Sequence, residues 1–353
     1  MRIPMAVRAS GLVTALGYNA PSTLAALRAG ISGVMTRAWA DREGGEPYRC
    51  ARIVLPQRWT GVELLADLVA PAIIECLQVC REETLSEVPL LIGTAHPSRP
   101  GRPEMIESQL LDALAERLDA PLHPASRIYP AGQVGCAQAL IDAQTLIAAE
   151  HARYVLIAGV DSYIDHETLD AYEVHRRVLC TGNFNGFLPG EAGSAVLLSA
   201  PVATGSALYV MGYGQAVETA PIDGSKPLRG EAMTQAVRNA LEMAGVTMSD
   251  IALRLSDLSG EHYKFKEAMF VAMRLDRSER RKPLDMWHPI EYLGEIGAAI
   301  LPCLLSWAAH AMRMKYAPGR HVLCHVGSDT GERAAFVLQS GIKDNDIGRE
   351  VTL

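Results

Sequence analysis

The sequence predicts an α/β fold in which helices cover both faces of the sheets. Two observations support this. Short apolar runs that are typical of buried strands alternate with helical segments along the whole chain, and the second half repeats the rhythm of the first. The chain has 353 residues, 49% of them hydrophobic and 6% aromatic, so it can form one large core or two fused cores.

The first half contains four predicted strands and three predicted helices. The strands are expected at 5–13, 88–95, 153–162 and 193–200, and the helices at 19–30, 62–80 and 136–150. Asn19 or Ser22 is the expected N-cap of the first helix, and Gly30 ends it. The helix at 136–150 is small and apolar nearly all round, which predicts burial on several sides.

In the second half of the chain, predicted strands and helices alternate as in the first half. Its strands are expected at 207–217, 253–260, 320–329 and 332–339, and its helices at 230–245, 263–275 and 295–314. The last of these helices contains Pro302. The stretch 198–208 comes closest to a linker, so we divide the chain into an N-terminal half, 1–200, and a C-terminal half, 201–353. The polar tail, 341–353, is expected to be frayed.

Charge and cysteine content exclude several classes of protein. The net charge is −7 without a basic block, which argues against nucleic acid or an anionic membrane surface as the main partner. No apolar run reaches the length of a membrane span, and the N-terminal stretch lacks the features of a signal peptide, so we expect a cytoplasmic protein. The seven scattered cysteines fit reduced thiols. Cys76 and Cys80 lie four apart without a second ligand pair, so we expect no metal site and no cofactor.

The segment "NGFLPGEAGSAVLL", 185–198, combines a turn, closely spaced glycines, a carboxylate and a short apolar run. This pattern predicts a turn that enters a buried strand, where glycines let the backbone bend and approach other chain closely. We interpret Gly190, Glu191 and Gly193 as structural rather than catalytic.

The order of these segments resembles the β-ketoacyl synthases of the thiolase superfamily. The opening "GLVTALGYNAPSTLAALRAGISG", the strand "VLIAGVDS", the segment "NGFLPGEAGSAVLL" and the closing "HVGSDTGERAAFVL" are similar to that family's motifs and follow its order over nearly the whole chain. The resemblance implies a thiolase-like five-layered α/β/α/β/α fold with two pseudo-repeated halves, and a dimer that pairs through a central strand.

Family members carry the acyl chain on a cysteine at the N-terminus of a buried helix. Here that turn is "AGQVGCAQALIDA". Counting back from the following strand places the nucleophile at Val134, and aligning the helix by its apolar pattern places it at Gln133. Cys136 comes two or three residues later, and a helix turns about 100° per residue. Its thiol is therefore expected to point away from the acyl pocket, unless the loop contains an insertion or deletion. We favour a buried packing role for Cys136, with a relocated nucleophile as the alternative.

The family's two catalytic histidines are absent at their expected positions. By register the first falls at Ser259 and the second at Gly294, and "YLGEIGAA" contains no imidazole. Asp329 stands where the family usually has a phenylalanine. Glu261 and His262 lie in one loop and Asp329 in another, and the fold implies that the loops converge. They form either a new polar site with His262 as general base or a salt-bridged surface cluster.

Three functions remain open. The first is a ketosynthase-like subunit without condensing activity, similar to the chain length factors. Those subunits carry a glutamine near the nucleophile position, and this chain has Gln133 there. The second is an acyl-binding or scaffold protein. The third, ranked below both, is an acyltransferase or 3-oxoacyl-ACP synthase with Cys136 as nucleophile and His262 as helper. The expected partners are an acyl carrier protein or acyl-CoA, and a second subunit in a homodimer or a heterodimer with a ketosynthase. The apolar segments 136–149 and 154–164 also suggest a second subunit that covers them.

Overall fold

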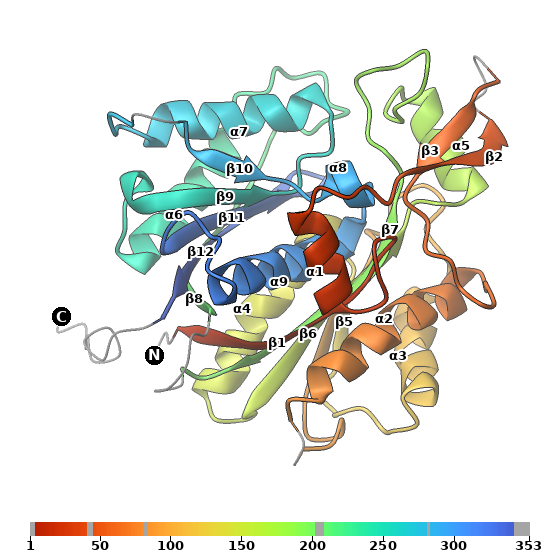
Figure 1. Ribbon diagram of the computed structural model, residues 1–353, viewed down its shortest axis with the longest axis horizontal. Helices are drawn as coiled ribbons and strands as arrows, with labels where there is room; N and C mark the ends of the chain where they lie inside the picture. The colour runs from red at the N-terminus through yellow and green to blue at the C-terminus, as the bar shows by residue number, and fades with distance from the viewer. Residues whose placement is uncertain (1–3, 41–44, 81–82, 202–207, 281–282, 342–353) are drawn as a thin grey trace.

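The computed structural model describes residues 4–40, 45–80, 83–201, 208–280 and 283–341. Ten strands join in one sheet, in the order β10-β9-β11-β12-β8-β1-β7-β6-β4-β5. Strands β1 and β8 pair over only a few residues at the middle of this order, so the sheet consists of two five-stranded arms. Figure 1 shows the two arms on opposite sides of a pair of central helices.

The two arms have the same pairing pattern. In each, three neighbouring strands run parallel at the outer end and the next two pairings are antiparallel. The first arm contains β1 (Met5–Val13), β4 (Leu90–Gly93), β5 (Arg127–Tyr129), β6 (Tyr154–Ser162) and β7 (Glu191–Ser199). The second contains β8 (Leu208–Val217), β9 (Ile251–Ser256), β10 (Asp285–Trp287), β11 (His321–Gly327) and β12 (Glu332–Ser340). This repetition confirms the predicted α/β fold of two similar halves, and the boundary at residue 200 stays a prediction.

Helices complete five layers. Helices α2 (Gly61–Leu77) and α3 (Ile106–Arg117) lie outside the first arm, and α6 (Glu231–Ala244) and α7 (His262–Leu275) lie outside the second. Helices α4 (Gly135–Ala148) and α9 (Ile300–Arg313) lie between the arms, where they form the central core with the inner sheet faces (Figure 1). Two smaller cores fill the outer layers. The predicted five-layered arrangement is therefore correct.

The remaining elements are short. They are α1 (Ala20–Arg28), α5 (His166–Val174), α8 (Ile290–Leu293), and a separate hairpin of β2 (Met35–Ala40) and β3 (Pro47–Cys50). Asn19 is the N-cap of α1, since its side chain accepts a hydrogen bond from the Ser22 amide. Helix α9 begins at Ile300 rather than at 295, which places Pro302 in its first turn, where a missing amide hydrogen costs no helical hydrogen bond.

The apolar segments that suggested a second subunit are covered within one chain. All but the first residue of β6 are buried, since α2 and α4 pack on it from the two faces. Most of α4 is buried as well. The burial argument for a dimer was therefore wrong, and the dimer itself stays a prediction. Within the described ranges, no helix is long and apolar enough to cross a membrane.

The entry to β7 forms a close backbone contact with the turn before α9. Leu188 accepts a hydrogen bond from the Glu295 amide, and Pro189 accepts one from Ala51. Gly294 has φ +68°, and a Cβ placed there would lie 2.5 Å from the Pro189 carbonyl oxygen. A Cβ at Gly190 would lie 2.2 Å from the Leu293 oxygen. Glycine is required at both positions because backbone occupies the space of a side chain.

We predict that Gly294→Ala destabilises the protein far more than Gly30→Ala. Both glycines have nearly the same positive φ, +68° and +69°, but a Cβ at Gly30 meets nothing within 4 Å. Gly30→Ala should therefore cost the backbone strain alone, about 1 kcal/mol, whereas Gly294→Ala adds a clash with rigid backbone. Urea unfolding measures both free energies. Equal losses for the two variants would contradict the close contact.

Candidate functional site

A cavity of about 280 Å³ lies at the N-terminal end of α4. A 3₁₀ turn, η1 (Gly132–Val134), precedes α4, and the matching turn η3 (Gly297–Ala299) precedes α9. Both turns begin with a glycine of positive φ. The cavity is lined by His96, Ser98, Arg99, Pro100, Gly132, Gln133, Tyr163, Tyr172, His175, Arg177, Asp223, Ser328, Asp329 and Thr330.

Two residues of the turn η1 line this cavity, Gly132 and Gln133, and only Gln133 brings a side chain to it. Its side chain is buried, and Nε2 lies 3.4 Å from the Tyr163 hydroxyl and 3.5 Å from Oε1 of Glu295. Val134 is also buried but does not line the cavity. Of the two positions that the sequence offered for the family's nucleophile, the structure therefore brings Gln133 to the cavity.

Cys136 lies one turn further along, in a different environment. Its side chain has no exposed area, and Sγ contacts the carbonyl oxygens of Ala158 at 3.2 Å and Ala298 at 3.3 Å. A Cβ at Gly93 or Gly159 would lie within 2.9 Å of that sulfur, so the thiol fits only because these two neighbouring positions have no side chain. Burial raises the pKa of the Cys136 thiol to about 12, which disfavours the reactive thiolate.

Ser259 and Gly294, at which the sequence predicts the absence of the family's histidines, differ in their surroundings. Ser259 is buried and donates a hydrogen bond to Glu261 Oε2 at 2.9 Å. Gly294 has no room for a side chain, as described above. Two other histidines, His96 and His175, line the cavity, and neither was singled out from the sequence.

The two loops that the sequence expected to converge meet at Arg177. This buried guanidinium donates from Nε to Glu261 at 2.8 Å and from Nη1 to Asp329 at 2.8 Å. Burial raises the pKa of Asp329, but Arg177, together with Lys264 and the Tyr172 hydroxyl, outweighs that effect, and the net pKa lies below its usual value. His262 is exposed, begins α7, and lines neither of the cavities described here. Its role as a general base stays a prediction.

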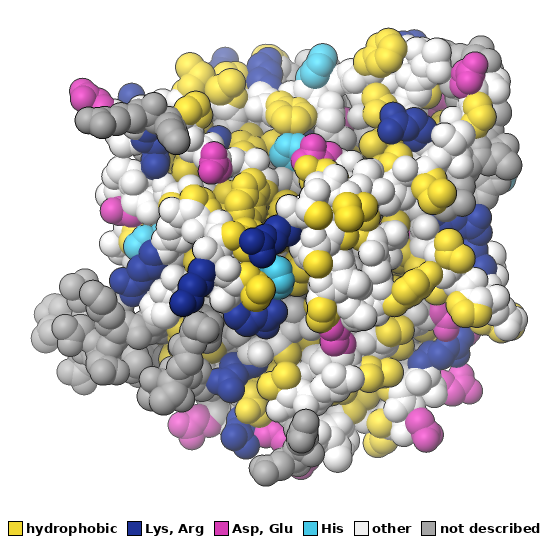
Figure 2. Space-filling view, viewed as in Figure 1, with side chains coloured by type: hydrophobic (Ala, Val, Ile, Leu, Met, Phe, Trp, Pro, Cys, Tyr) yellow, Lys and Arg dark blue, Asp and Glu magenta, His cyan; other side chains and the backbone are white. Residues whose placement is uncertain are grey.

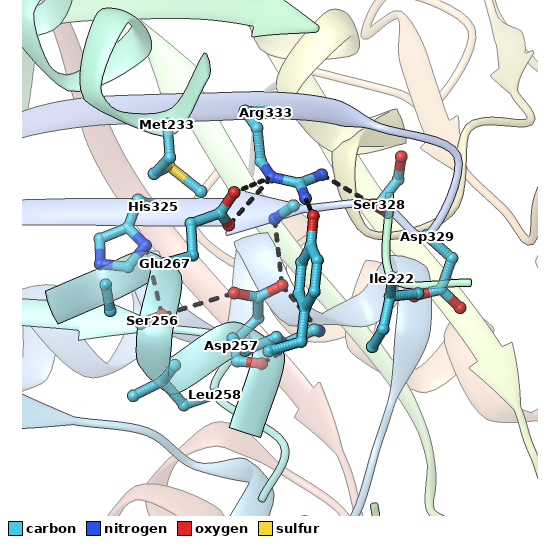
Figure 3. A pocket seen from close by; sticks show the side chains of 14 residues that line it. Ile222, Met233, Ser256, Asp257, Leu258, Glu267, His325, Ser328, Asp329 and Arg333 are labelled. Carbon is cyan, nitrogen blue, oxygen red and sulfur yellow. Dashed lines mark hydrogen bonds and ion pairs between the residues drawn. The ribbon is translucent and has the colours of Figure 1, made fainter. Parts of the chain in front are cut away.

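A buried lysine, Lys264, lines a smaller cavity beneath α7. Lys264 Nζ lies 3.1 Å from Asp257 and 3.7 Å from Glu295. The smaller cavity, about 10 Å³, has room for about one water molecule. Figure 3 shows Asp257 and Glu267 pointing toward it, with Glu267 paired to Arg333. Burial raises the pKa of Glu295 to about 7, against the opposing effect of Lys264.

Arg99 is a second buried guanidinium at the cavity. Its Nη2 faces Asp161 at 3.2 Å, and its Nη1 donates to the Ser162 carbonyl at 3.1 Å. Its Nε has no hydrogen-bond acceptor among the described residues. The guanidinium also lies over the Tyr163 ring, 4.8 Å from its centroid. Arg99 therefore fixes the wall that carries Tyr163.

Glu191 has structural contacts, in agreement with the interpretation of its segment. It is fully buried at the start of β7 and forms a bidentate ion pair with Arg58, in which Nη1 and Nη2 donate to Oε1 and Oε2 at 2.9 and 2.7 Å. It also accepts hydrogen bonds from the Ile53 amide and the Ser162 hydroxyl. These contacts hold residues 53–58 against the sheet, and Glu191 does not line the cavity.

Sequence reasoning missed most of the charged residues around the cavity: Arg99, Arg177, Lys264 and Glu295. For two of them, Lys264 and Glu295, the sequence contains a pattern that could have identified them. Lys264 and Glu267 share the helical face of Ala268 and Val271, so they are charges on a buried face. Glu295 follows Gly294, where the register predicted the family's second histidine. Arg99 and Arg177 lie in irregular segments, where no period marks them.

The charges that line the cavity are balanced. Two cations, Arg99 and Arg177, and two carboxylates, Asp223 and Asp329, belong to its lining. Arg177 is paired with Asp329 at 2.8 Å and Arg99 with Asp161 at 3.2 Å, so each guanidinium already has a carboxylate partner. Among the described residues, no group of His, Cys, Asp and Glu side chains could hold a metal ion.

We predict a pH dependence of stability that Glu295→Gln removes. The folded protein holds a proton on Glu295 up to about pH 7, whereas the unfolded chain releases it near 4.5. The folded state binds more protons in between, so this carboxyl lowers stability as pH rises from about 4.5 to 7. Urea unfolding across this range should show a smaller decline for Glu295→Gln. The control is Glu116→Gln on the exposed side of α3. Parallel curves for wild type and Glu295→Gln would contradict the assignment.

Comparisons with known proteins give matches in structure only. No protein-family model matches the sequence, and no curated protein sequence does. A solved structure of the ishigamide ketosynthase/chain length factor has a TM-score of 0.76 at 14% sequence identity, and the match covers 97% of this chain and 100% of that one.

Two further structures are similar over the same extent. A ketosynthase in complex with its chain length factor from Xenorhabdus doucetiae has a TM-score of 0.71 at 12% identity, covering 96% of this chain and 98% of that one. A beta-ketoacyl synthase from Burkholderia phymatum has a TM-score of 0.72 at 16% identity, covering 97% and 100%. The expected resemblance is confirmed at the level of structure: this chain has the thiolase-like fold of the ketosynthases and chain length factors.

Proposed function

We propose that this protein is a ketosynthase-fold subunit that does not catalyse condensation and that pairs with an active ketosynthase, as a chain length factor does. The observation that carries this proposal is the exchange of residues at the start of α4. An amide, Gln133, faces the cavity, while the nearest thiol, Cys136, is buried against backbone carbonyls.

Two further features support the absence of condensation. No imidazole is present at Ser259 or Gly294, so the groups that polarise the extender's thioester carbonyl in the family are missing. Loss of such a donor typically costs about a hundredfold to a thousandfold in rate. Arg177, a cation of the cavity lining, is also already paired with Glu261 and Asp329, which disfavours its pairing with a malonyl carboxylate.

The proteins whose solved structures are similar to this chain support a ketosynthase as the partner. They include ketosynthases together with their chain length factors, and an acyl-carrier protein in complex with its ketosynthase. The edge strand β5 is the part of the first arm available for pairing with a second subunit, because among the described strands only β4 pairs with it. An acyl-binding scaffold that needs no ketosynthase is the second candidate, favoured by the cavity of about 280 Å³ that remains beside Gln133.

We predict that Gln133→Cys gains a reactive thiol that the native protein lacks. A cysteine at 133 would face the cavity near a helix N-terminus, which favours the thiolate. Val134→Cys is the matched control, because residue 134 is buried and does not line the cavity. Iodoacetamide labelling near neutral pH, read by peptide mass spectrometry, should modify the introduced thiol of Gln133→Cys. It should modify neither the introduced thiol of Val134→Cys nor the native Cys136.

The same proteins test condensation. With acyl and malonyl donors, the wild type should form neither an acyl adduct nor a β-ketoacyl product, and Gln133→Cys should form at most the adduct, since the imidazoles are still missing. Fast labelling of Cys136 in the wild type, blocked by an acyl donor, would instead support the relocated nucleophile. Condensation by the isolated wild type that Cys136→Ala abolishes would overturn the proposal.

We predict that the protein forms a dimer through β5. Strands β5 and β10 each end one arm of the sheet, so their outward amides provide an internal comparison. Hydrogen–deuterium exchange should slow at 127–129, but not at 285–287, when the chain pairs with itself or with a ketosynthase, because pairing buries the β5 edge. Native mass spectrometry identifies which dimer forms. A monomer at all concentrations, with and without a ketosynthase, would favour the scaffold instead.

A further inference from the structure

The cavity beside Gln133 has a polar lining from its rim to its buried end. Ser98, His175 and Asp223 are exposed, so the cavity opens to solvent on their side, whereas Gln133 and Tyr163 are buried. Among the described residues that line it, none is Leu, Ile, Val, Met or Phe. Burial of an aliphatic chain is favourable where apolar side chains surround it, so this lining does not fit such a chain.

Charged ligands find no free counter-charge at the buried end of this cavity. Arg177 is paired with Asp329 at 2.8 Å. Arg99 is paired with Asp161 at 3.2 Å. An anion would therefore have to displace a carboxylate that is already bound, and a cation would approach two guanidinium groups. Figure 2 shows basic and acidic side chains interspersed over the face that it presents, so charge of one sign does not dominate that face. These observations favour an uncharged ligand.

Two donors and two acceptors of the lining have no hydrogen-bond partner among the described residues. The Ser98 amide donates to His96 Nδ1 at 3.2 Å, so the hydrogen of the neutral imidazole is on Nε2, the first free donor. The second is the Tyr163 hydroxyl, which accepts from Gln133 but has no described acceptor for its own hydrogen. The free acceptors are Gln133 Oε1 and Asp223 Oδ1. Polar groups inside proteins are usually hydrogen-bonded, so this set favours a ligand that both donates and accepts.

Hydroxyl groups match this mixed set of donors and acceptors. A hydroxyl donates and accepts at once, and it rotates to suit its neighbours. The rings of Tyr163 and Tyr172, with centroids 5.8 Å apart, add apolar ring surface to the polar lining. The ring of a sugar or a cyclitol has the same two characters, C–H groups on its faces and hydroxyls around its edge. The volume of about 280 Å³ is several times the roughly 30 Å³ of one water molecule, so the cavity has room for such a ring.

We propose that this cavity binds a small uncharged polyhydroxylated ring, of the size of a monosaccharide or a cyclitol. Gln133 Oε1 and Asp223 Oδ1 accept hydrogen bonds from hydroxyls of the ligand. His96 Nε2 and the Tyr163 hydroxyl donate to others. All of these groups belong to one chain, so the inference goes beyond the proposed subunit pairing and does not depend on it. It narrows the second candidate function, because a scaffold with this lining binds a polar ligand in place of an acyl chain.

The test is saturation transfer difference NMR on the isolated full chain with four separate probes. Methyl β-D-glucopyranoside and myo-inositol are the two uncharged rings, a sugar and a cyclitol. Methyl β-D-glucuronide adds a carboxylate to the sugar, and hexanamide represents an acyl chain. At least one uncharged ring should give a saturable signal, with a dissociation constant of about 1 mM, as expected for so small a ligand. The glucuronide and hexanamide should give none.

Two variants place the ligand in the cavity. Gln133→Leu removes the amide with little change of volume, and Asp223→Ala removes a carboxylate from the exposed rim. Each should weaken binding of the uncharged ring about fivefold to tenfold, because a hydrogen bond is lost. The matched control is Asp112→Ala on the exposed side of α3, whose affinity should equal that of the wild type. Circular dichroism and urea unfolding establish that each variant is folded.

Three outcomes would overturn the inference. The first is the absence of a saturable signal from both uncharged rings. The second is a signal that neither variant weakens, since the ligand would then lie elsewhere on the surface. The third is saturable binding of hexanamide in place of the rings, which would support the acyl-binding scaffold. Each of these leaves the native mass spectrum that tests subunit pairing unchanged, so failure of this inference is distinguishable from failure of the proposed function.

Discussion

The close contact between Gly190 and Gly294 is the constraint on which the site depends. Backbone from the entry of β7 runs against backbone from the turn before α9, and no side chain fits between them. This contact joins the first arm to the second-arm turn that carries Glu295. It also leaves no room for a side chain at 294, the position at which the sequence predicts the absence of the family's second histidine.

Buried ion pairs hold the loops around the cavity together. Arg177 links the two loops beside the cavity, and Lys264 links the carboxylates of Asp257 and Glu295. Removing one partner of such a pair leaves an uncompensated charge in a low dielectric, which is strongly destabilising. The network therefore holds the cavity wall in one arrangement, in which both arginines of the lining already have carboxylate partners.

The start of α4 shows how a short offset along a helix changes function. Gln133 and Cys136 are three residues apart, yet one faces a cavity and the other is enclosed by the carbonyls of Ala158 and Ala298. Burial without a nearby cation raises the pKa of the thiol, so its position makes it unreactive as well as inaccessible. The glycines of β4 and β6 make room for the sulfur, which suits a packing role.

The sequence by itself determined the fold class, the order of the long elements and the two similar halves, because apolar periodicity encodes which faces are buried. It also placed Gln133 before the helix that contains Cys136, as the structure has them in η1 and α4. Short elements such as β5 and β10 were not predicted from the sequence, since a segment of three residues is too short to show a hydrophobic period. Only the tertiary structure decided that Gln133 rather than Val134 faces the cavity, and that Arg177 joins Glu261 to Asp329. Those contacts join residues more than eighty positions apart, and a local pattern holds no information about such distances.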